Sequence, residues 1–302
     1  MVAQPGLFIN ILILTFHQAY AIINDMEKEN RRTSPEKIIT EAFASNEFLE
    51  VGASNHGKMG EKAIGIFTLG EVIYRISKRK TIENKGYDTP ESLQFKLAAL
   101  LPSFISSQRK LDSKRDSLNK TEKAKALEDV IGINHIVREL IESETYDTVN
   151  QLTQFAGNYF RSIGQSAAVI NYAGEKMREV VQGMRHEIAA QSVLNNIPGV
   201  EDVTECTSAE DERRGRDVRV TYKGISFFFD IKASERGAND ANKKKQAYNF
   251  DDSIAIWSGF SWDDFGNKLI PPSDVLGEKE SYFVELLDGL VEDGYGQELI
   301  AS

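Results

Sequence analysis

Asp217, Asp230 and Lys232 are the residues of this 302-residue sequence whose types and spacing most clearly suggest chemistry. Hard oxygen ligands from a few carboxylates, with coordination positions left for water and phosphate, suit Mg²⁺. A lysine beside such an ion can orient or deprotonate an attacking water, and it can offset charge that develops on a phosphate. The three side chains therefore suit hydrolysis of a phosphodiester, provided that the fold brings them together.

A predicted hairpin meets that condition. The segments DVRVTY (217–222) and ISFFFDIK (225–232) have the alternation and the β-branched and aromatic content of strands. Lys223 and Gly224 separate them as a two-residue turn, with glycine where a positive φ is needed. Counting outwards from this turn places the two aspartates directly opposite each other, and the lysine two residues further along points to the same face.

The opposite face of the hairpin supports this register. A slip of one residue would move an apolar layer suited to packing on a helix into solvent; the layer consists of Val218, Val220, Tyr222, Ile225, Phe227, Phe229 and Ile231. Two like charges directly opposed on a sheet are destabilising, and a divalent cation between them removes the repulsion. In the competing interpretation the aspartates flank an exposed hairpin and the lysine only pairs with them.

The elements around the hairpin predict a mixed α/β fold. Apolar residues at three-four spacing predict helices, and no proline falls between 103 and 197 to interrupt them. Helices are expected at 121–141, 149–163 and 175–196, strands at 200–206 and 253–260, and a short helix at 239–250. From residue 175 the order is therefore α-β-β-β-α-β. We expect a mainly helical domain at 1–174, an α/β domain at 175–260 and an acidic tail of doubtful order at 261–302.

Charge and composition restrict the function classes. The net charge is −10, but residues 261–302 hold ten acidic and two basic residues, so the rest of the chain is nearly balanced and a nucleic-acid surface stays open. A single cysteine, Cys206, excludes a disulfide framework and a Cys-rich zinc site.

No run of eighteen apolar residues predicts a membrane span, so we expect no membrane partner. Residues 6–21 are expected to form a packed helix rather than a signal peptide, which favours the cytoplasm.

With these elements and acidic residues, the sequence resembles the PD-(D/E)xK nuclease superfamily, which has the restriction-endonuclease-like fold. The segment GMRHEIAAQSVLNNIPGVEDV (183–203) supplies a helix glutamate, Glu187, and a helix-to-strand lead, and RGRDVRVTYKGISFFFDIKAS (214–234) supplies the D…DxK pattern. The likeness covers roughly residues 175–260 and is nearest to Holliday-junction resolvases and related DNA-repair nucleases. Two residues depart from the family pattern: Arg216 stands where the family has proline, and Asp230 stands where glutamate is commoner. Both departures keep open the alternative that this chain is a catalytically inactive member.

The resemblance implies a set of roles. Asp217, Asp230 and the backbone carbonyl of Ile231 would hold Mg²⁺, for which Mn²⁺ would substitute, and Glu187 would complete the metal site. Lys232 would serve the attacking water, and a glutamine of the following helix would lie near the site. That glutamine is Gln246. Phosphates of DNA would be held by two basic runs, namely Arg213, Arg214 and Arg216, and Lys243, Lys244 and Lys245. Neighbouring His186 is interpreted as a surface or capping residue rather than a general base.

Three hypotheses follow from these observations. The first is a Mg²⁺-dependent DNA nuclease acting in restriction, in junction resolution or in repair and phage replication. The second is a catalytically inactive DNA-binding or assembly subunit with the same fold. The third is a mainly helical interaction protein whose α/β part is coincidental. A homodimer is one option for the first, because cutting two strands usually calls for two active sites.

Overall fold

The structure, a computed structural model, describes residues 38–40, 42, 72–73, 90–114, 117–206, 216–247 and 253–295. Contacts between residues divide the chain into two units. One comprises Met1–Ala99 and Phe155–Asn171, and the other comprises Leu100–Gln154 and Tyr172–Ser302. The second unit, which contains the sheet and the candidate site, therefore includes residues 100–154, which the sequence had placed in a separate helical domain.

Long helices precede the sheet: α5 (Pro90–Lys114), α6 (Lys120–Glu142), α7 (Val149–Ser162) and α8 (Ala167–Leu194). The last three confirm the predicted helices, although α8 begins eight residues earlier than expected, whereas α5 was not predicted as an element. Helix α6 begins with a capping box in which Asn119 and Glu122 each accept a hydrogen bond from the other's backbone NH. The helix predicted at residues 6–21 lies outside the described residues. Within the described ranges, no helix is both long and apolar enough to cross a membrane.

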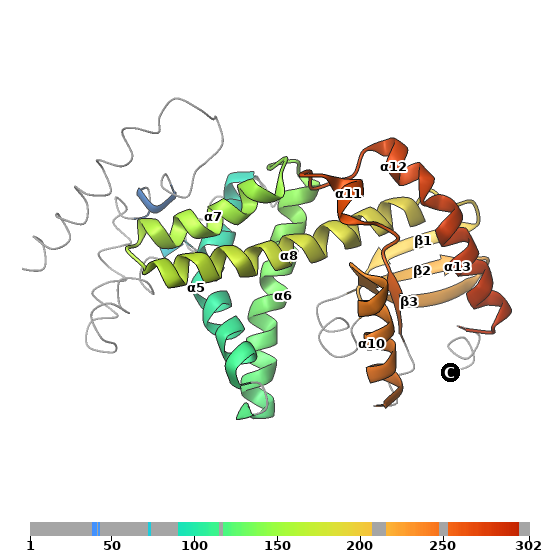
Figure 1. Cartoon of the computed structure of the whole chain (residues 1–302), viewed down its shortest axis with the longest axis horizontal. Helices are drawn as coiled ribbons and strands as arrows, with labels where there is room; N and C mark the ends of the chain where they lie inside the picture. The colour runs from blue at the N-terminus through green and yellow to red at the C-terminus, as the bar shows by residue number, and fades with distance from the viewer. Residues whose placement is uncertain are drawn as a thin grey trace, which may run out of the picture. The chain divides into compact units, whose positions relative to one another are not determined.

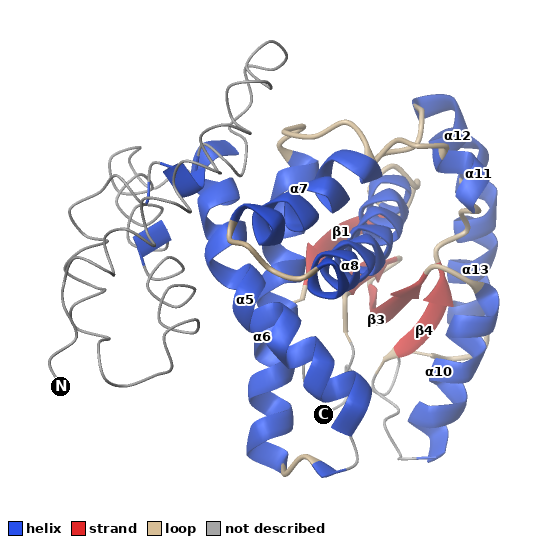
Figure 2. Ribbon diagram, turned by 60° about the vertical axis from the view of Figure 1, so that its left-hand side comes forward, coloured by secondary structure: helices blue, strands red, loops and turns tan. Residues whose placement is uncertain are grey.

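One mixed four-stranded sheet follows, in the order β1-β2-β3-β4. Figure 1 labels β1, β2 and β3, and Figure 2 shows β4 beside β3. The strands are β1 (Val200–Glu205), β2 (Val218–Tyr222), β3 (Ile225–Lys232) and β4 (Ile254–Trp257), and α10 (Glu235–Ala247) connects β3 to β4. Strands β1, β2 and β3 pair antiparallel, whereas β4 pairs parallel to β3. The predicted α-β-β-β-α-β order from α8 onward is confirmed. A crossover helix is what allows β4 to lie parallel beside β3.

The register of the β2–β3 hairpin is also confirmed. Lys223 and Gly224 both have positive φ, 50° and 77°, as a type I′ turn requires. The ladder then pairs Tyr222 with Ile225 and, at its far end, Val218 with Phe229. A later helix stabilises the turn through the carboxylate of Asp288. The hydroxyl of Tyr222 donates to Oδ1 of Asp288 at 2.9 Å, and Nζ of Lys223 donates to the same oxygen at 2.7 Å.

The apolar face of the hairpin forms the core of this unit. Its side chains pack against the last turns of α8 and against α13 (Glu280–Glu292), which runs across the strands in Figure 1. The buried members are Ala189, Ala190, Val193, Leu194, Ile197, Val218, Val220, Tyr222, Phe227, Phe229, Ile231, Ile256, Phe260, Phe265, Phe283, Leu287 and Leu290. The expectation that this layer packs on a helix is therefore correct.

Residues 261–295 are not the tail that the sequence suggested. They form α11 (Trp262–Phe265), α12 (Ser273–Glu278) and α13, and Phe283 and Leu287 are fully buried against the sheet. The acidic residues misled the prediction because α13 is amphipathic. Its carboxylates, such as exposed Glu285, lie on the solvent face, while every third or fourth residue is apolar.

We expect Leu287→Ala to lower the free energy of unfolding by about 2–5 kcal/mol, because it leaves a cavity in the core. Glu285→Ala on the exposed face of the same helix is the matched control and should stay within about 0.5 kcal/mol of wild type. Urea unfolding followed by circular dichroism measures both. Equal stability of the two variants would show that α13 is not part of the core.

Candidate active site

Asp230 lies at the centre of a charged cluster on the face of β3 opposite the core. Its side chain is only 7% exposed, and each of its carboxylate oxygens meets an ammonium group. Oδ1 forms an ion pair with Lys232, two residues along the strand, and Oδ2 lies 3.1 Å from Nζ of Lys245 in α10. A buried carboxylate needs such partners, since burial of an unpaired charge costs several kcal/mol.

Asp217 comes close to this cluster, but not by direct opposition to Asp230. The paired ladder ends at Val218, and the Asp217 NH donates to the carbonyl of Phe229 at 2.8 Å. The Asp217 carboxylate instead accepts a 2.6 Å hydrogen bond from the NH of Ile231. This irregularity at the strand end corrects the predicted face-to-face pair: the carboxylate gains a backbone donor instead of facing a like charge.

Lys232 is the group that connects the candidate acidic residues. Burial would lower the pKa of its ammonium, but attraction to Asp230, Asp217 and Glu187 outweighs burial and raises the pKa above its ordinary value. Three of the four other side chains predicted from the sequence to act in catalysis, all except Gln246, are therefore within electrostatic reach of Lys232. A lysine with a raised pKa stays charged at neutral pH, so it is suited to orienting water or neutralising a phosphate and not to acting as a base.

Glu187 and Asp217 line the same pocket. The other lining residues come from α6, α8 and the end of β1, and the full set is Asn134, His135, Met184, Glu187, Glu205, Cys206 and Asp217. Sequence reasoning did not name Asn134, His135 or Glu205 as site residues. Asn134 and His135 reach the pocket because α6 lies beside the end of β1, where His135 and Arg138 contact Glu205. No local pattern in the sequence could have indicated that contact. Cys206 is buried.

Helix α10 presents Lys245, and not Gln246, to the site. The side-chain amide of Asn242 bonds both the NH and the carbonyl of Ala255 at 2.8 Å, which attaches the helix to the outer edge of β4. Lys245, three residues later on the same side, then reaches Asp230, while Gln246 is exposed. Figure 2 shows α10 beside β4.

The predicted DNA-contacting residues have different surroundings. Lys243 and Lys244 are exposed on α10, where they could meet phosphates. Arg216 is buried, and its guanidinium lies 3.9 Å from the centre of the Phe228 ring, so it is not a surface contact in this structure. Arg213 and Arg214 lie outside the described residues.

The candidate site has the oxygen donors that a divalent cation prefers, but its carboxylates are not grouped as they would be around a bound cation. Glu187, Asp217 and Asp230 offer the carboxylate oxygens that Mg²⁺ prefers. Among the described residues, however, no three His, Cys, Asp or Glu side chains are grouped closely enough to hold a metal ion. The ammonium groups of Lys232 and Lys245 stand at the Asp230 carboxylate instead, so a cation would have to displace at least one of them.

His186 is buried, which corrects the prediction of a surface or capping residue. It is 1% exposed, and its Nδ1 lies 2.8 Å from the hydroxyl of Ser258, whose NH in turn donates to the carbonyl of Lys232 at 2.9 Å. Burial, and to a smaller extent the charge of Arg185, lower the pKa of the imidazole to about 4, against the opposing effect of Asp264. Its neighbours make it a neutral core residue behind the site.

Comparison with known proteins finds no matching family model, no matching curated protein and no matching solved structure.

Replacement of Lys245 tests whether it neutralises Asp230. We expect Lys245→Met to destabilise the protein by about 1–3 kcal/mol, because one oxygen of a buried carboxylate loses its charged partner. Lys244→Met, the adjacent exposed position, should change stability by less than about 0.5 kcal/mol. Thermal and urea unfolding measure the difference, and indistinguishable variants would contradict the ion pair.

The buried His186 predicts a specific loss of stability in acid. Between pH 6.5, near the unfolded pKa, and pH 4, the unfolded chain binds a proton that the folded chain does not, so stability falls as pH falls. We expect His186→Gln to remove this part of the pH dependence, on the order of 2 kcal/mol. Unfolding free energies measured at pH 7, 5.5 and 4 for both proteins provide the test. Parallel pH curves would rule out a low pKa at His186.

Proposed function

We propose that this protein is a metal-dependent nuclease that hydrolyses phosphodiester bonds of DNA with a restriction-endonuclease-like core. The observation that supports it best is the ion pair between Lys232 and the buried Asp230, next to which Asp217 accepts a hydrogen bond from the NH of Ile231. Glu187 lines the same pocket as Asp217, and attraction to the three carboxylates keeps the pKa of Lys232 raised. These side chains come from α8, the residue before β2, and β3 of an α-β-β-β-α-β unit. A charged lysine held among carboxylates at the end of a sheet has the composition that phosphodiester hydrolysis requires.

Each residue has a role in this proposal. Asp217 and Asp230, with the carbonyl of Ile231, would hold Mg²⁺ or Mn²⁺, and Glu187 would complete the set. The ion, when bound, would supply an activated water and stabilise charge on the phosphate. Lys232 would orient that water and neutralise the phosphoryl oxygens, in keeping with its raised pKa. Lys245 would leave Asp230 for a substrate phosphate, a role that the sequence had suggested through its place in the basic run.

DNA is the substrate class that the surface charges favour. Lys243 and Lys244 are exposed on the same helix that carries Lys245, so the phosphates of a bound strand would be contacted without reading of base sequence. Arg213 and Arg214, just before β2 in the sequence, belong to the same proposal.

Cleavage assays test this function directly. Supercoiled plasmid, linear duplex, single-stranded and four-way DNA, each incubated with Mg²⁺ or Mn²⁺, cover the restriction, junction-resolving and repair roles. We expect Asp230→Asn and Lys232→Met to reduce cleavage by at least about 100-fold, because each removes a charge required at the reacting phosphate. Asp240→Asn, an exposed carboxylate on α10, is the control and should cleave as wild type does. Cleavage that survives both site variants would place the activity elsewhere.

A second candidate is an inactive DNA-binding or assembly subunit with the same fold. The double neutralisation of Asp230 by Lys232 and Lys245 favours it, since both carboxylate oxygens already have cationic partners. DNA affinity that is independent of Mg²⁺, without cleavage of any DNA form, would support this candidate. A rise in melting temperature with Mn²⁺ that is larger in Lys245→Met than in wild type would instead favour the nuclease, because that variant leaves Asp230 open to a cation.

A further inference from the structure

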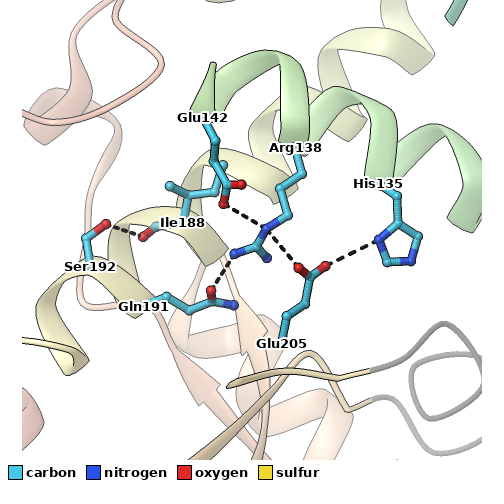
Figure 3. Close-up of polar contacts among 7 residues, drawn as sticks. All are labelled: His135, Arg138, Glu142, Ile188, Gln191, Ser192 and Glu205. Carbon is cyan, nitrogen blue, oxygen red and sulfur yellow. Dashed lines mark hydrogen bonds and ion pairs between the residues drawn. The ribbon is translucent and has the colours of Figure 1, made fainter. Parts of the chain in front are cut away.

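A buried arginine, Arg138 in α6, connects three elements beside the candidate site. Its Nε lies 2.9 Å from Oε1 of Glu142 in the same helix and 3.4 Å from Oε2 of Glu205 at the end of β1. Its Nη2 donates to the side-chain oxygen of Gln191 in α8. Figure 3 shows the guanidinium among these three side chains, with His135 on the other side of Glu205.

The two distant partners of Arg138 flank two candidate acidic residues. Gln191 follows Glu187 by four residues, one turn of α8. Glu205 precedes Cys206, whose NH donates to the carbonyl of Asp217 at 3.0 Å. The guanidinium therefore bonds a residue one helical turn from Glu187 and a residue whose neighbour, Cys206, contacts the backbone of Asp217. Glu187 and Asp217 are two of the three acidic residues that line the pocket, and Glu205 is the third.

We propose that Arg138 is a positioning residue that sets the separation of Glu187 and Asp217 by bonding Gln191 and Glu205 at the same time. This inference rests on the proposed function for its importance to catalysis, but its geometric part does not. Arginine suits the task because its planar fork bonds several acceptors in fixed directions, which the single ammonium of lysine cannot do. Burial strengthens the contact with Gln191: Arg138 and Gln191 are 7% and 8% exposed, so removal of the guanidinium leaves the Gln191 oxygen without this bond in a region that water scarcely reaches. Glu205, at 40% exposure, loses the ion pair but keeps access to water.

Native-state amide exchange measures the position of Asp217 without reference to activity. The reporters are the NH groups of Cys206 and Ile231, which donate to the carbonyl and the carboxylate of Asp217. We expect Arg138→Met to speed exchange at both amides by about tenfold beyond the change caused by a general loss of stability. Leu287→Ala, which weakens the core elsewhere, sets that general level. Arg219→Met, which removes an exposed arginine–aspartate pair from β2, is the matched arginine control.

Two further variants keep the test decisive. Arg138→Lys should give an intermediate exchange rate, since it restores the charge but not the fork. Glu205→Gln should speed exchange at the same amides, and it decides the matter if Arg138→Met does not fold, because Glu205 is 40% exposed and tolerates the change. Exchange at Cys206 and Ile231 that rises no more in Arg138→Met and Glu205→Gln than in Leu287→Ala would overturn the proposal.

Cleavage kinetics then link the position to the reaction. If the wild type cleaves DNA with Mg²⁺, Arg138→Met should lower kcat with little change in KM, since the pocket carboxylates and not the DNA contacts are displaced. A wild type that cleaves nothing would end the proposed function while the exchange measurement still decides the role of Arg138. The two failures are therefore distinguishable.

Discussion

The β2–β3 hairpin has a single register available to it, and the candidate site depends on that register. A type I′ turn at Lys223–Gly224 aligns the strands, and burial of alternate residues prevents a slip. Because side chains alternate strictly along a strand, packing Phe227 and Phe229 into the core obliges Asp230 and Lys232 to share the opposite face. The core and the charged cluster are two consequences of one constraint.

Burial of Asp230 creates the second requirement, which is a supply of positive charge. Lys232 supplies one positive charge from the same strand, and Lys245 supplies another from α10. The second contact is possible only because Asn242 attaches α10 to the edge of β4 through Ala255. Protection of a sheet edge and neutralisation of a buried carboxylate are thus performed by one short helix, whose remaining basic side chains face solvent.

Segments remote in sequence complete the unit. Helix α13 closes the apolar face and holds the hairpin turn through Asp288, although its acidic composition resembles that of a tail. On another side of the unit, α6 brings Arg138 and His135 to Glu205, so a helix from the first half of the chain borders the pocket that holds Glu187 and Asp217. The proposed chemistry would therefore depend on residues well outside the segment with the D…DxK pattern.

Local patterns in the sequence determined the hairpin, its register, the helices from 120 to 194 and the shared face of Asp230 and Lys232. Each of these follows from the chemistry of a turn or from a period of 2 or 3.6 residues, which a short window contains. Only the tertiary structure decided that Asp217 bonds the NH of Ile231, that Lys245 and not Gln246 reaches Asp230, and that His186 is buried. These outcomes depend on which elements pack together and on how buried charges find partners, and those are interactions between residues far apart in the chain.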